Sequence, residues 1–183
     1  MAEAKRAARI VGSLLTFARQ TPTDRSRTEV NLLLGQTVEL RRLALGQSGI
    51  SLEADLDPPV PVTWADAGQL QQVFLNLIAN AEQALNGVEG TRRIAVRSRR
   101  QGESIVIGVS DSGRGIAPEH LPHIFNPFHT TKPRGVGTGL GLSISDGIIR
   151  EHGGTLRVHS ELGNGALFEV LLPIVSPPVT ASA

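Results

Sequence analysis

Hydrophobic residues recur at helical spacing in three parts of the chain, residues 2–20, 31–44 and 66–85. Apolar side chains three and four positions apart are typical of helices that bury one face. Pro22 ends the first helix, and Asn31 is the expected N-cap of the second. The apolar stripe of the first consists of Ala7, Ile10, Val11, Leu14, Leu15 and Ala18. That of the second consists of Leu32, Leu33, Val38, Leu40 and Leu43.

Other segments have the patterns of strands. Residues 50–56 alternate between apolar and polar, residues 91–113 indicate two strands joined by a turn, and residues 155–173 indicate a closing hairpin. A Pro- and Gly-rich loop at 112–138 and a short helix at 139–151 lie between the two strand pairs. Because helices alternate with paired strands, we expect an α/β two-layer sandwich. Its mixed, mostly antiparallel sheet should be covered on one face by helices.

Composition narrows the class of protein. The chain has 183 residues, of which 40% are hydrophobic and 19% charged, enough for one core and an appendage. The absence of cysteine excludes disulfides and thiolate metal sites. A net charge of +1 with 3% aromatic residues gives little basis for nucleic-acid binding. No apolar run reaches the roughly 18 residues of a membrane span. We therefore expect a cytoplasmic chain without membrane contact, which leaves open an anchor elsewhere in the full-length protein.

Four carboxamides lie on one flank of the helix at 66–85. At 100° per residue, Gln69, Asn76, Asn80 and Gln83 fall together beside the apolar stripe. Asparagine is a poor residue inside a helix, because its side chain competes for backbone hydrogen bonds. The line is either a satisfied polar border or a site for a hard cation such as Mg²⁺, which takes oxygen ligands.

An aspartate followed by two glycines ends the strand before the long loop. In "VSDSGRGI" these are Asp111, Gly113 and Gly115. The motif is consistent with a tight turn in which glycines supply positive φ. It is equally consistent with a carboxylate that accepts an amine proton from a base, while glycine backbones let a flat ring approach.

The loop before the short helix combines cations with glycines. Lys132 and Arg134 precede a helix N-terminus expected near Thr138 or Gly139, where free N–H groups favour an anion. Glycine occupies every second position from 135 to 141, but neither the G-x-x-x-x-G-K-[ST] nor the G-x-G-x-x-G motif fits. Loops of this length are commonly lids or binding loops.

Together and in this order, the three features resemble the ATP-binding domain of sensor histidine kinases, in the gyrase, Hsp90, histidine kinase and MutL superfamily. "NLIANAEQA" looks like the N box, "DSGRGI" the G1 box, "IFNPFHTTK" the F box and "GTGLGLSI" the G2 box. The resemblance implies the Bergerat-type ATP-binding fold and covers about residues 30–174. It extends weakly to "RAARIVGSLLTFAR", which looks like the end of a dimerisation helix.

The resemblance, together with the polar segment after Pro22 and the C-terminal "SPPVTASA", divides the chain into four expected parts. Residues 1–22 are the end of the dimerisation helix, 23–29 a linker, 30–174 the catalytic ATP-binding domain and 175–183 a disordered tail. The implied cofactors are ATP and Mg²⁺.

Site residues follow from the motifs. The resemblance implies that Asn80 ligates Mg²⁺ and that Asn76, one turn earlier, lines the phosphate site as a second metal ligand and catalytic residue. Asp111 would accept the adenine amino group while Gly113 and Gly115 let the ring pass.

Residues of the lid complete the implied site. Lys132 would reach the terminal phosphates as a catalytic residue, assisted by Arg134. Gly135 and Gly137 would form the hinge of the lid, and Phe125 and Phe128 would anchor it. The phosphate chain would lie against the start of the following helix, at Gly137, Thr138, Gly139, Leu140 and Gly141.

Two departures bear on the reaction. Gln83 stands where many kinases of this family have a lysine, which gives Lys132 and Arg134 more weight. Asn76 stands where hydrolysing relatives have a glutamate as general base, and an amide cannot take up that proton, so hydrolysis of ATP is disfavoured. We therefore expect ATP to be held for transfer to another nucleophile.

In the family that nucleophile is a histidine of a dimerisation domain. None of the five histidines lies in a His-Glu or His-Asp box. We expect a catalytic fragment that binds ATP without phosphorylating itself. Its partners would be the histidine-bearing dimerisation domain of the same kinase, in a full-length homodimer, and a response regulator. The alternatives are an ATP-gated binding module without phosphoryl transfer and an anti-sigma-type serine-protein kinase.

Overall fold

The computed structural model describes residues 24–58, 62–131 and 137–176. The predicted helix at 2–20, the lid positions Lys132, Arg134 and Gly135, and most of the predicted tail lie outside the described residues.

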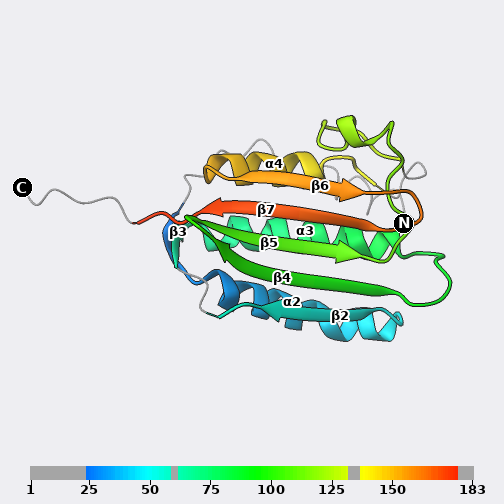
Figure 1. The fold of residues 1–183 in the computed structure, drawn as a ribbon, viewed down its shortest axis with the longest axis horizontal. Coiled ribbons are helices and arrows are strands. Elements are labelled where there is room, and N and C mark those ends of the chain that lie inside the picture. Colours follow the sequence, from blue (N-terminus) through cyan, green and yellow to red (C-terminus); the bar gives the residue numbers. More distant parts are fainter. Residues whose placement is uncertain (1–23, 59–61, 132–136, 177–183) are drawn as a thin grey trace, which may run out of the picture.

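Five strands form one mixed sheet, which Figure 1 shows face on. The strand order is β2–β4–β5–β7–β6. Only the pair β2–β4 is parallel among the described strands of this sheet, and the other three pairs are antiparallel. The predicted mixed, mostly antiparallel sheet is confirmed. The strand bounds are β2 Ser51–Leu56, β4 Arg93–Gln101, β5 Ser104–Asp111, β6 Thr155–Ser160 and β7 Ala166–Pro173.

Three helices of the described chain lie on one face of this sheet and leave the other face open (Figure 1). They are α2 Val30–Gln47, α3 Ala67–Ala84 and α4 Gly141–Glu151. The α/β two-layer sandwich is therefore confirmed. The apolar stripe predicted for α3 is buried between helix and sheet, as expected from its spacing. Its members are Leu70, Val73, Phe74, Leu77, Ile78, Ala81 and Leu85.

Side chains fix the start of α3 and the end of α4. The Asp66 carboxylate caps α3 by accepting a hydrogen bond from the Gln69 N–H at 3.0 Å. The Asp66 N–H donates to Nε2 of the buried His152, 3.0 Å away, at the C-terminus of α4. Nδ1 of His152 lies 2.8 Å from the Ile148 carbonyl oxygen. Because Nε2 accepts, Nδ1 carries the proton, and a neutral imidazole joins the end of α4 to the start of α3.

Helix α2 departs from the prediction in two ways. It begins at Val30 with Glu29 at the N-cap, so the assignment of Asn31 as N-cap was wrong. The Asn31 side chain instead donates to the Asp57 carbonyl at 2.9 Å and accepts from Ser98 Oγ at 2.6 Å. Three leucines of the predicted stripe point away from the core, with exposed fractions of 58% for Leu32, 65% for Leu40 and 74% for Leu43.

A second, two-stranded sheet occupies part of the predicted linker. Strand β1, Ser26–Thr28, pairs with β3, Thr63–Ala65, in antiparallel register. Val175, in the predicted tail, continues this arrangement, because its carbonyl accepts from the Trp64 N–H at 3.0 Å. Ordered structure therefore extends beyond residues 30–174 at both ends. The segment 112–138 also contains a 3₁₀ turn, η1 Leu121–His123.

No helix in the described part of the chain is both long enough and apolar enough to cross a membrane.

Candidate functional site

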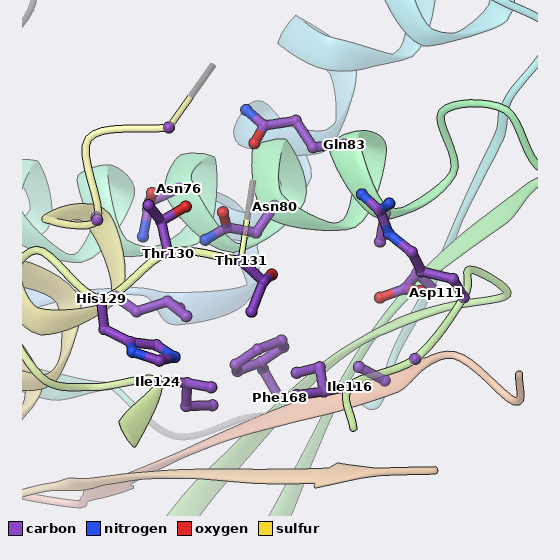
Figure 2. A pocket seen from close by; sticks show the side chains of 18 of the residues that line it. Asn76, Asn80, Gln83, Asp111, Ile116, Ile124, His129, Thr130, Thr131 and Phe168 are labelled. Atoms are coloured by element: carbon purple, nitrogen blue, oxygen red, sulfur yellow. The ribbon is translucent and has the colours of Figure 1, made fainter. Parts of the chain in front are cut away.

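A pocket of about 340 Å³ lies beside α3, at the end of β5 and the start of α4 (Figure 2). Residues of all four motifs, the N, G1, F and G2 boxes, line it. They meet there because the sheet order brings the end of β5 next to β7 and because α4 packs against α3. Its polar lining includes Asn76, Asn80, Gln83, Asp111, Arg114, His129, Thr130, Thr131 and Thr138. Its remaining lining residues are Ala84, Gly115, Ile116, Ile124, Gly137, Gly139, Gly141, Leu142, Ala166 and Phe168.

The carboxamides of α3 form one wall of the pocket. Asn76, Asn80 and Gln83 line it, as their helical spacing predicts, and Gln69 does not. Nδ2 of Asn76 donates to Oγ of Ser145 on α4 at 2.9 Å, and Ser145 is buried. This hydrogen bond joins the two helices and fixes the position of the Asn76 side chain.

Asp111 lies at the opposite end of the pocket from Asn76, and Figure 2 shows one of its carboxylate oxygens directed inward. Oδ1 accepts a hydrogen bond from the Gly113 N–H at 2.8 Å. Burial raises the pKa of the carboxyl above its ordinary value of 3.8, and hydrogen bonds from the Gly113 and Ala166 backbone offset only part of that effect. A half-buried carboxylate that accepts from two backbone N–H groups therefore presents its remaining lone pairs to the pocket.

The two glycines after Asp111 are required by packing within the protein. A Cβ at Gly113 would lie 2.6 Å from Asp111 Oδ1 and 2.8 Å from the Ala84 carbonyl oxygen. Gly115 has φ +69°, and a Cβ there would lie 2.0 Å from the Glu161 carbonyl oxygen. Gly115 lines the pocket, whereas Gly113 does not. A side chain at either position would therefore collide with the chain's own backbone.

The start of α4 closes the end of the pocket near Asn76. The helix begins at Gly141, two or three residues later than predicted, with the buried Leu140 at its N-cap position. A Cβ at Gly139 would lie 2.4 Å from the Phe128 carbonyl carbon, and one at Gly141 would lie 2.4 Å from Asn76 Oδ1. Gly137, Thr138, Gly139 and Gly141 line the pocket, and Leu140 packs in the core instead.

Several lining residues escaped the sequence analysis. Ile116, Ile124 and Phe168 form an apolar wall, which Figure 2 shows below the polar side chains. Ile116 ends the G1 box and Ile124 begins the F box, whereas Phe168 lies on β7, outside all four motifs. His129, Thr130 and Thr131 lie in the F box itself. There, Phe125 packs against the core, whereas the side chain of Phe128 is 64% exposed.

The pocket combines three chemical environments along its length. A carboxylate acceptor lies at one end, an apolar wall in the middle, and amides with a helix N-terminus at the other end. First-turn N–H groups of a helix favour anions. Among the described residues no three His, Cys, Asp or Glu side chains could hold a metal ion together. A cation here would therefore use carboxamide oxygens along with ligands from an anion and water, as Mg²⁺ does.

Comparison with known proteins is consistent with this geometry. A sequence model of the family described as histidine kinase-, DNA gyrase B-, and HSP90-like ATPase matches residues 65–176. The sensor histidine kinase ZraS of Escherichia coli (strain K12) is 37% identical over 172 residues, which cover 94% of this chain and 36% of ZraS. The chain thus spans little more than a third of the length of that relative.

Two solved structures show the same arrangement. Full-length ShkA in complex with AMPPNP aligns over 96% of this chain and 37% of that chain, with a TM-score of 0.82 and 28% identity. The histidine kinase ThkA in complex with the response regulator protein TrrA aligns over 94% of this chain and 48% of that chain, with a TM-score of 0.77 and 26% identity.

Proposed function

Because this chain belongs to the family of histidine kinase-, DNA gyrase B- and HSP90-like ATPases, as a catalytic ATP-binding domain of the sensor histidine kinase type, we propose that its pocket holds ATP and Mg²⁺ for phosphoryl transfer to a histidine. The observation that carries the proposal is the position of Asp111, a half-buried acceptor at one end of a pocket whose other end is formed by Asn76 and the start of α4. Adenine fits the acceptor end, and a phosphate chain fits the helix N-terminus.

Binding of the base would depend on Asp111 and the apolar wall. The 6-amino group of adenine donates to the carboxylate, while Ile116 and Phe168 contact the ring. The Asp111 carboxylate is held in position by the Gly113 N–H, which donates to Oδ1, and by a backbone hydrogen bond from Ala166. Binding of the base would therefore fix the position of the whole nucleotide along the pocket.

The residues at the other end fit Mg²⁺ that is shared with phosphate. Asn80 and Asn76 supply carboxamide oxygens, and Ser145 holds the Asn76 side chain in position. The cation would neutralise negative charge on the phosphates. Gly137, Thr138, Gly139 and Gly141 would lie along the phosphate chain, and we propose Lys132 and Arg134 as cations that reach its terminal groups.

The chemistry would be positioning and charge neutralisation. Asn76 cannot act as a base, so water is not activated there and ATP persists until a stronger nucleophile arrives. The nitrogen of a neutral imidazole then forms a bond to the γ-phosphorus, the bond to the β,γ-bridging oxygen breaks, and ADP leaves with that electron pair. The imidazole loses its N–H proton to solvent.

The acceptor and the downstream partner are proposed from the relatives. We place the acceptor histidine on a dimerisation domain of the same kinase, in a full-length homodimer, and we expect a response regulator to receive the phosphoryl group. The ThkA complex with TrrA supports the second partner. We expect the domain to act in the cytoplasm, where ATP is available.

Transfer in trans tests the proposed reaction. The chain is mixed with a separately produced, histidine-bearing dimerisation domain of the same kinase and with γ-labelled ATP and Mg²⁺. We expect acid-labile, base-stable label on the added domain and none on the chain itself. Base-labile label on a serine would instead support the serine-kinase alternative. Binding of ATP without any label would support the ATP-gated module.

A further inference from the structure

We propose that His129 binds the phosphate chain of the nucleotide through its Nε2 atom, an inference that rests on the proposed function of the pocket. His129 is one of the lining residues, and Figure 2 shows its ring directed into the pocket. Nε2 is buried and has no hydrogen-bond partner among the described residues. Buried polar atoms normally have partners, so an orphaned nitrogen at the edge of a binding pocket indicates a group that a ligand completes.

The backbone before His129 turns this ring inward. Phe128 has φ +66°, the left-handed region that residues other than glycine rarely adopt. Its N–H donates to the Gly139 carbonyl oxygen at 2.9 Å, which ties the F box to the segment before α4. The Phe128 side chain is 64% exposed while the next side chain, His129, enters the pocket. Strained backbone of this kind is concentrated at ligand clamps and switch regions.

The position of His129 selects the phosphate chain over the base. In Figure 2, His129 lies at the end of the pocket with Asn76 and Thr130, and Asp111 lies at the opposite end. An imidazole N–H donates a hydrogen bond, and phosphate oxygens only accept. Among the described lining residues Arg114 is the one Lys or Arg, and Gln83 is an uncharged amide. An imidazole N–H would therefore add a donor at the phosphate end, beside the carboxamide and hydroxyl groups that already line it.

Two further histidines surround this ring without entering the pocket. The ring centroids of His120 and His123 lie 5.6 and 5.9 Å from that of His129. Neither lines the pocket, and His123 is exposed. Because it lies outside the pocket, His123 provides a matched control for substitution of a histidine in the same segment.

The test compares ligands that contain and lack phosphates. His129→Phe keeps a ring of similar size without a donor, and His129→Gln keeps an N–H donor. We measure the affinities of ATP, ADP and adenosine by calorimetry for both variants, with His123→Phe as control. His129→Phe should weaken ATP and ADP roughly tenfold, equivalent to about 1.4 kcal/mol, and leave adenosine unchanged. His129→Gln should retain most of the affinity, and His123→Phe all of it.

Three outcomes would overturn the inference. They are unchanged ATP affinity in a folded His129→Phe variant, an equal loss for adenosine, and an equal loss in His129→Gln. Should His129→Phe not fold, the ¹⁵N resonance of His129 Nε2 in the wild-type chain decides the question, because it should shift with ATP and ADP but not with adenosine. The same shift with adenosine, or none with ATP, refutes the contact. Failure of the wild-type chain to bind ATP at all would instead refute the proposed function.

Discussion

Replacing the half-buried carboxylate of Asp111 by an amide of the same shape should change which base the pocket accepts. In the wild-type chain Oδ1 is held by the Gly113 N–H at 2.8 Å, and the Ala166 backbone also donates to the carboxylate. In Asp111→Asn the amide oxygen should take the place of Oδ1, because the NH₂ group cannot accept from the Gly113 N–H. The NH₂ group then faces the pocket, where the 6-amino group of adenine also donates.

The magnitude follows from the lost hydrogen bond. A hydrogen bond to a charged group contributes about 1.5–3 kcal/mol, so ATP affinity should fall roughly 10- to 150-fold. Inosine triphosphate carries an oxygen in place of the amino group and should be excluded by the wild-type carboxylate. The new NH₂ group can donate to that oxygen, so the variant should gain affinity for it. The ratio of the two affinities therefore moves further than either affinity alone.

Isothermal titration with both nucleotides measures this ratio directly. Asp55→Asn is the matched control, because it removes the same charge from a side chain that is 82% exposed on β2. The ratio cancels any general loss of folded protein. An unchanged ratio in Asp111→Asn, or the same change in Asp55→Asn, would remove Asp111 from the base site.

Three further predictions concern the same pocket. Asn80→Ala should abolish the enhancement of ATP binding by Mg²⁺, and a titration with and without the cation in which the enhancement persists would contradict the metal assignment. Ser145→Ala leaves the Asn76 amide without its 2.9 Å partner and should lower the free energy of unfolding in urea by about 1–3 kcal/mol; no change would show that the bond is dispensable. The raised pKa of Asp111 means that the folded state binds more protons than the unfolded state above pH 3.8. The free energy of unfolding should therefore fall as pH rises from 3.8 through the folded pKa, and this contribution should be missing in Asp111→Asn melts.

Sequence patterns predicted the elements that are set by local periodicity. The stripe of α3 and the placement of Asn76 and Asn80 beside it follow from 3.6-residue spacing, and the structure places both at the pocket. On α2 the same reasoning was only half right. Leu32 and Leu40 lie at helical spacing yet face outward, because spacing identifies an apolar face without showing whether a sheet covers it.

Long-range pairing explains the rest of the differences. Strand β1 was expected to be part of a linker, because a strand of three residues is too short to show an alternating pattern. Its pairing with β3, about 37 positions further along the chain, stabilises it instead. Asparagine is a residue type that often caps helices, but the position of the Asn31 side chain is set by its hydrogen bond with Ser98 on a distant strand. His129 lies in the F box, but the motif alone did not single out its side chain, because the left-handed backbone at Phe128 is a feature of the fold.

The location of the nucleotide is the central claim, and a titration of the ¹⁵N-labelled chain with Mg²⁺ and ATP followed by NMR tests it most directly. We predict saturable shifts for one nucleotide per chain at the backbone amides of Gly115, Gly141 and Ala166, which line the pocket. The resonances of backbone amides beside Leu40, on the exposed face of α2, should not shift. The absence of saturable shifts at millimolar ATP in a folded chain, or shifts confined to the open face of the sheet, would contradict the account.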